Sequence, residues 1–110
     1  MTAEITIRRY VTRNGRDTFG EWLSHFKDAR TRAKIVARID RLSVANFGDC
    51  KNLGGGLFEL RIEWGPGYRV YYAMIGRSCI LLLCGGNEKS QPADIRMARK
   101  YLQDYGERAS

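Results

Sequence analysis

The second half of the chain places four basic side chains on or beside successive expected strands: Lys51, Arg61, Arg69 and Lys89. An arginine guanidinium can hold two oxygens of one phosphate and a lysine ammonium can neutralise another, so this set predicts a polyphosphate partner. The chain has one histidine, His25, and three cysteines, which lack the spacing of a metal site and are expected as free thiols. We therefore expect anion chemistry without a metal or other cofactor.

The same cations can help to cleave RNA as well as bind it. When a ribose 2′-oxygen attacks its own phosphate, the site must remove one proton, supply another to the leaving oxygen and stabilise the charged transition state. Arg61 and Arg69 are the candidates for charge stabilisation. The proton acceptor stays open among Lys51, Lys89 and Tyr71, and neighbouring cations would lower a lysine pKa toward neutrality.

A second group of side chains is expected to bind RNA without reacting. Its members are Tyr71, Glu59, Gln91, Arg38 and Arg41. Tyr71 shares a strand face with Arg69 and offers a ring on which a base can stack. An alternative stays open for Arg61, because Glu59 and Glu63 flank it on one strand face and would pair with it as an ordinary solvated surface.

Length and composition predict one modest domain, which we expect to span residues 1–110. Nineteen Lys and Arg against twelve Asp and Glu give a formal net charge of +7, as in proteins that meet nucleic acid or acidic partners. No apolar run approaches the roughly 18 residues of a membrane span, and the N-terminus does not have the pattern of a signal peptide. We expect a cytoplasmic protein without a membrane partner.

The first half of the chain predicts one strand followed by two helices. Residues 4–12 alternate polar and apolar side chains up to an Asn-Gly turn. Asp17 suits the N-cap of a helix with an apolar stripe of helical period, and Asp28 begins a second helix. Basic residues occupy much of the circumference of that second helix, which ends near Gly48.

The second half predicts three strands and a last helix. Segments 57–64 and 68–75 alternate in side-chain character, so each has one face that packs and one that meets solvent or substrate. Segment 79–84 is continuously apolar, as a strand covered on both faces would be, and exits through a Gly-Gly pair. A helix then starts near residues 90–92. The order β-α-α-β-β-β-α indicates an α+β class, to which residues 51–53 can add a short strand.

The motifs in this order resemble the RelE/ParE superfamily of toxins from bacterial toxin–antitoxin modules, in particular its HigB-like branch of addiction module killer proteins. The segments that carry the resemblance are Lys51-Asn52-Leu53 before a glycine run, Leu57-Phe58-Glu59-Leu60-Arg61, Tyr68-Arg69-Val70-Tyr71-Tyr72, Gly85-Gly86, and Lys89-Ser90-Gln91 with Asp94, Ile95 and Ala98. Together with the order of the expected elements, these segments make the resemblance span essentially the whole chain.

The resemblance implies a mostly antiparallel sheet with two N-terminal helices packed on it and a C-terminal helix. It also implies an endoribonuclease, an mRNA interferase acting on messenger RNA at the ribosome, that is neutralised by a cognate antitoxin. Antitoxins of this branch are typically helix-turn-helix proteins, so operator DNA would be met only through the antitoxin complex. The arginine-rich second helix would contact ribosomal RNA phosphates, an acidic antitoxin surface, or both.

Two other functions fit the same residues. A ParE-like toxin shares the fold but inhibits gyrase by binding, and a non-catalytic basic RNA-binding module would keep the fold without the chemistry. The cation set argues against the gyrase inhibitor, whereas the lack of an obvious general acid favours the binding module. Discrete cuts in transcripts, DNA damage with intact transcripts, or neither would separate the three functions.

Overall fold

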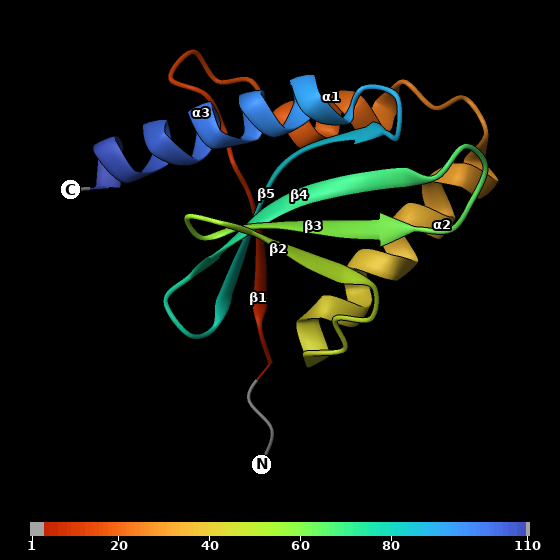
Figure 1. Cartoon of the computed structure of the whole chain (residues 1–110), viewed down its shortest axis with the longest axis horizontal. Coiled ribbons are helices and arrows are strands. Elements are labelled where there is room, and N and C mark those ends of the chain that lie inside the picture. The colour runs from red at the N-terminus through yellow and green to blue at the C-terminus, as the bar shows by residue number, and fades with distance from the viewer. Residues whose placement is uncertain (1–3, 110) are drawn as a thin grey trace.

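A mixed five-stranded sheet carries three α-helices in the computed structural model of this chain, which describes residues 4–109. In chain order the elements are β1 (Thr6–Arg9), α1 (Thr18–Ser24), α2 (Ala29–Asp40), the 3₁₀ helix η1 (Arg41–Val44), β2 (Cys50–Gly54), β3 (Leu57–Ile62), β4 (Tyr68–Ile75), β5 (Cys79–Asn87) and α3 (Gln91–Ala109). The strands lie in the order β1-β5-β4-β3-β2, with β1 parallel to β5 and the other neighbours antiparallel. Figure 1 shows the twisted sheet with α2 beside the end of β3 and α3 running across the top of the view. The expected α+β class with a C-terminal helix is confirmed.

Local sequence signals set the starts of both N-terminal helices. The carboxylate of Asp17 accepts a hydrogen bond from the Gly20 N–H at 2.9 Å, and that of Asp28 accepts one from the Arg30 N–H at 3.0 Å. Each carboxylate satisfies an N–H group that has no partner inside its helix. The predicted N-cap at Asp17 and the predicted start of the second helix at Asp28 are therefore confirmed.

In the first half of the chain, two element boundaries differ from the prediction. The first strand ends at Arg9 rather than near residue 12, because the chain folds back and Val11 forms a single bridge with Asp17. The second helix tightens after Asp40 into η1 and ends at Ala45, whose φ of 60° is left-handed. The Ala45 N–H bonds back to the last turn, which closes the helix before the predicted Gly48.

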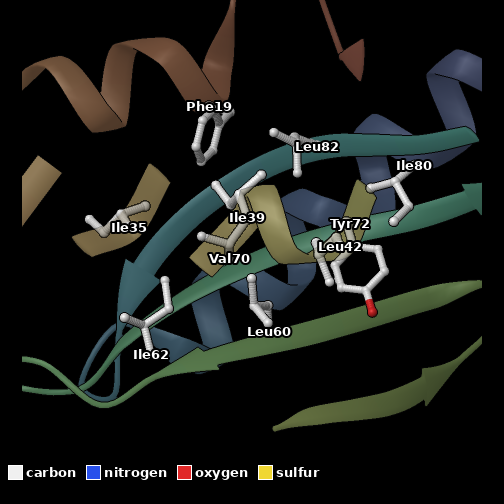
Figure 2. Packing of buried hydrophobic residues seen from close by; sticks show 10 residues of the cluster. All are labelled: Phe19, Ile35, Ile39, Leu42, Leu60, Ile62, Val70, Tyr72, Ile80 and Leu82. Atoms are coloured by element: carbon white, nitrogen blue, oxygen red, sulfur yellow. The ribbon is translucent and has the colours of Figure 1, made fainter. Parts of the chain in front are cut away.

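One face of the sheet packs against α1, α2 and η1. Figure 2 shows side chains of β3, β4 and β5 directed at Phe19 of α1 and at Ile35 and Ile39 of α2. The buried members of this core are Phe19, Ile35, Ile39, Leu42, Leu60, Ile62, Val70, Tyr72, Ile80 and Leu82. Those from β3 and β4 alternate along the strands with the predicted functional residues, so the predicted division into two faces is confirmed.

The opposite face of the sheet carries both α3 and the predicted functional residues of β3 and β4. Leu57, Tyr71 and Leu83 pack there with Ala98 of α3 in a second apolar cluster. Near the first turn of α3, where Gln91 lies, these apolar contacts give way to charged side chains. The polar site therefore begins where α3 begins.

The Gly85-Gly86 pair lies within β5, which corrects the prediction that the strand exits there. A Cβ at Gly85 would overlap the Trp22 ring of α1, and a Cβ at Gly86 would overlap the Asp94 carboxylate of α3. Both faces of β5 are closely covered at this point. Glycine is required at both positions because no side chain fits.

Gly86→Ala should destabilise the protein by about 1–3 kcal/mol, the usual cost of forcing extra atoms into a packed site. The added methyl group would displace Asp94 and Ser90 at the start of α3. Urea unfolding measures the loss. Gly106→Ala is the control, because a Cβ there meets open space and should not destabilise the helix. Equal stability of Gly86→Ala and the wild type would contradict the close contact.

Candidate functional site

Two arginines from neighbouring strands converge on one buried carboxylate. Arg61 of β3 lies directly opposite Arg69 of β4, and Glu59 shares their face two residues before Arg61. The Nε atoms of Arg61 and Arg69 each lie 3.5 Å from the Glu59 carboxylate, one at each oxygen. Glu59 has no exposed surface, whereas the side chains of Arg61 and Arg69 are 37% and 14% exposed. The structure thus brings together the two arginines that strand parity placed on one face.

Two further side chains hold Glu59 in place. Gln91, the first residue of α3, donates from Nε2 to Glu59 Oε1 at 2.6 Å, and Tyr71 donates its hydroxyl to the same oxygen at 3.3 Å. Glu59 Oε2 and both arginine Nε atoms make no hydrogen bond within the described residues. Glu59 is therefore anchored through one oxygen, and its second oxygen faces Arg61.

Hydrogen bonds at the start of α3 position Gln91. Ser90 Oγ donates to the Asp94 carboxylate, and the backbone N–H groups of Asn87 and Ser90 each donate to the other residue's side-chain oxygen. Burial raises the pKa of Asp94, and the hydrogen bond from Ser90 opposes that shift. These contacts fix the first turn of α3 so that Gln91 can reach Glu59.

The cluster keeps a positive charge after its internal pairing. Glu59 carries one negative charge against the two positive charges of Arg61 and Arg69, which leaves a net +1. A guanidinium has five N–H donors, and Glu59 faces the Nε of each, so the others can serve a ligand. The alternative predicted an ion pair between Arg61 and Glu59, and that pair is present. The cluster is not an ordinary solvated surface, however, because its acid is fully buried.

The two predicted lysines lie around the cluster rather than in it. Lys51 is opposite Glu59 in the β2–β3 register, so it shares the face of the cluster, and its side chain is exposed. Lys89 is exposed in the turn between β5 and α3. Within residues 4–109, neither ammonium pairs with a carboxylate. Both can therefore meet an anion from solution.

Arg61 also lines a groove of about 470 Å³ between β3 and α2. Arg38 and Arg41 line the helical side, so the structure brings these two predicted RNA-binding residues to the same groove. Arg38 donates to the backbone carbonyl of Phe47, and it therefore also holds the loop before β2. Lys34 also lines the groove, and it was not among the predicted binding residues. In the sequence, only its position in a helix rich in basic residues indicated a binding role.

A protein of Haemophilus influenzae (strain ATCC 51907 / DSM 11121 / KW20 / Rd), described as an uncharacterized protein, is 48% identical to this chain over 89 residues. The match covers 81% of this chain and 90% of the relative. The chain belongs to the family of that protein. No family model matches the chain. Family membership therefore assigns no activity, and the function has to be argued from the site.

The part of the chain that the structure describes contains neither a metal-binding cluster nor a membrane-spanning helix. Between residues 4 and 109, no three His, Cys, Asp or Glu side chains gather where they could hold a metal ion. Over the same residues, every helix is too short or too polar to cross a lipid bilayer. The cluster itself offers guanidinium, carboxylate, phenol and amide groups, and the two lysines beside it offer ammonium groups.

Burial changes the role expected of Tyr71. The side chain has no exposed surface, so its ring cannot stack on a base in this conformation. Burial, then the charges of Glu59 and Asp94 and the hydrogen bond to Glu59, raise the pKa of Tyr71 and keep the phenol neutral. A neutral hydroxyl that donates to Glu59 is a poor proton acceptor. Of the three acceptors that the sequence left open, Lys51 and Lys89 remain.

The raised pKa of Tyr71 predicts a loss of stability at alkaline pH. A raised folded-state pKa contributes stability that is fully present below the unfolded pKa of about 10 and is lost as the pH rises above it. Urea unfolding between neutral and strongly alkaline pH should show the free energy of unfolding falling less steeply in Tyr71→Phe than in the wild type. Equal slopes would contradict the assigned environment of this phenol.

Proposed function

We propose that this protein is a toxin of the RelE/ParE superfamily, of the HigB-like branch, that cleaves messenger RNA without a metal. The observation that carries the proposal is the pair of guanidiniums of Arg61 and Arg69, which lie on directly paired strand positions and share one buried carboxylate. An RNA phosphate at this position would meet donors from both arginines. Because Arg69 is largely withdrawn from water, its contact with a phosphate would be strengthened.

The reaction follows from where the phosphate would lie. The ribose 2′-oxygen attacks the adjacent phosphorus, and the bond from phosphorus to the 5′-oxygen of the next nucleotide breaks. One proton leaves the 2′-hydroxyl and one reaches the departing 5′-oxygen, which gives a 2′,3′-cyclic phosphate and a free 5′-hydroxyl. In this scheme Arg61 and Arg69 stabilise the transition-state charge and Glu59 positions them. Lys51 and Lys89 exchange the protons.

The arrangement of elements supports the same superfamily. The chain starts with a strand and two helices, continues with the antiparallel strands β2 to β5 and ends in a helix, as the resemblance implies. In this proposal the toxin is cytoplasmic, acts on messenger RNA at the ribosome and is neutralised by a cognate helix-turn-helix antitoxin. Operator DNA is contacted only through the antitoxin complex.

The proposal is tested by mapping RNA ends after brief induction of the protein in cells and after incubation of purified protein with RNA in EDTA. We expect growth arrest, discrete cuts in transcripts and 2′,3′-cyclic phosphate ends. A parallel reaction with ribosomes is run in Mg²⁺, which keeps them assembled, and it shows whether cleavage depends on them. Growth arrest with DNA damage and intact transcripts would instead indicate a gyrase inhibitor.

A second function, non-catalytic RNA binding, is favoured by the surroundings of the proton-transfer groups. The carboxylate of Glu59 is buried and the phenol of Tyr71 is held neutral, so proton transfer is left to the two exposed lysines beside the cluster. A binding module would retain RNA with an affinity that falls steeply with salt and would leave it intact. End mapping and binding measurements on the same RNA distinguish the two functions.

A further inference from the structure

The groove beside Arg61 exists because β3 loses its neighbouring strand there. Strand β2 begins at Cys50, opposite Leu60, so the next residue, Arg61, has no partner on β2. Its N–H instead donates to the backbone carbonyl of Asp49 at 2.9 Å. The loop before β2 and the side of α2 then form the other walls. The resulting volume of about 470 Å³ lies within the range of ligand-binding sites.

Cations from separate elements line this groove. Lys34 and Arg41 contribute from α2 and η1, and Arg61 contributes from β3. Within residues 4–109, neither Lys34 nor Arg41 is paired with a carboxylate, and the Lys34 ammonium lies over the Trp64 ring at 5.0 Å from its centroid. Arg61 belongs both to this groove and to the Glu59 cluster. The two basic regions therefore meet at one residue.

We infer that the RNA strand bound at Arg61 and Arg69 continues into this groove, where its neighbouring phosphates contact Lys34 and Arg41. This inference rests on the proposed function and adds a flanking subsite to it. Separated cations along a groove match the repeated charges of a nucleic acid backbone, whereas a single phosphate would occupy only part of them. The groove therefore predicts a substrate longer than the cleaved dinucleotide.

Two carboxylates in the groove wall favour RNA over an acidic peptide. Asp49 and Glu63 line the groove together with the cations. Carboxylates repel the side chains of an acidic peptide, but they can accept hydrogen bonds from ribose 2′-hydroxyls and from base amino groups. A strand of RNA offers both the anions that the cations need and the donors that the carboxylates need.

The test measures binding of labelled oligoribonucleotides by fluorescence anisotropy, with a 2′-deoxy sugar only at the cleaved step, because these keep the phosphates and the flanking 2′-hydroxyls but lack the attacking one. A dinucleotide is compared with longer oligonucleotides extended at the 5′ or the 3′ end. The wild type should gain affinity on extension toward one end. The double variant Lys34→Ala with Arg41→Ala should bind the dinucleotide as the wild type does but lose that gain. For this variant, the slope of log affinity against log salt concentration should be less negative by about 0.7 for each lost phosphate contact.

The matched control also replaces one lysine and one arginine, but at positions outside the groove. Lys27→Ala with Arg30→Ala, in exposed positions just before and at the start of α2, should keep the length-dependent gain and the full salt slope. Equal losses in the two double variants, or stronger binding of polyglutamate than of the longer oligonucleotides, would overturn the subsite.

The cleavage assay separates this result from the proposed function. If Arg69→Ala abolishes cleavage while the two double variants bind alike, the nuclease proposal stands and the flanking subsite is rejected. If binding depends on Lys34 and Arg41 while the wild type leaves RNA intact, the groove is an RNA site and the nuclease proposal is rejected.

Discussion

Arg69→Ala should lower the rate of RNA cleavage by about 100- to 1000-fold, which corresponds to about 2.7–4 kcal/mol of lost transition-state stabilisation. The guanidinium is mostly buried and lies on the face shared with Arg61, so it can approach a phosphate in a site with little water. Cleavage of RNA by purified protein, with growth arrest as the cellular counterpart, measures the effect. Arg69→Lys should be intermediate, because it keeps the charge but loses the planar fork of donors.

Arg77→Ala is the control for charge removal. Arg77 is exposed in the turn at the other end of the β4–β5 hairpin, away from the residue that pairs with Arg69. This variant should cleave RNA at the wild-type rate. Thermal unfolding of all three variants shows whether a loss of activity follows from a loss of folding. A folded Arg69→Ala protein that cleaves normally would remove Arg69 from the reaction.

Glu59→Gln should lower the free energy of unfolding by about 3 kcal/mol, the lower end of the cost of breaking a buried ion pair. The wild-type carboxylate is fully buried and faces both Arg61 and Arg69, so the amide would leave two neighbouring guanidiniums without a counter-charge. We expect the lower end of this range because water still contacts Arg61 and partly stabilises its unpaired charge. Urea unfolding measures the change.

A control and a compensating variant make this prediction specific. Glu63→Gln removes the same charge from an exposed position just after β3 and should change stability by no more than about 0.5 kcal/mol. Adding Arg61→Gln to Glu59→Gln should recover part of the loss, because one of the uncompensated cations is removed, with a coupling of about 0.5–3 kcal/mol. Additive losses would mean that Glu59 and Arg61 do not interact.

Much of the architecture could be predicted because it depends on neighbours in the chain. The caps at Asp17 and Asp28 involve N–H groups two or three residues away, and strand parity follows from the alternation of side chains along one strand. Parity was enough to place Arg61 and Arg69 on the same face. The Gly85-Gly86 pair was interpreted as a strand exit, since the Trp22 ring and the Asp94 carboxylate that cover it come from distant segments.

The sequence by itself thus determined the element types, the division of the sheet into two faces and the cations on one of them, because these depend on short-range periodicity. Tertiary structure alone decided that Glu59 is buried between two arginines, that Gln91 reaches it from 32 residues away and that Tyr71 is neutral. It also decided that Arg61 joins the groove of α2. These features arise when α3 and α2 dock on the sheet, and docking depends on contacts between residues that no local pattern connects.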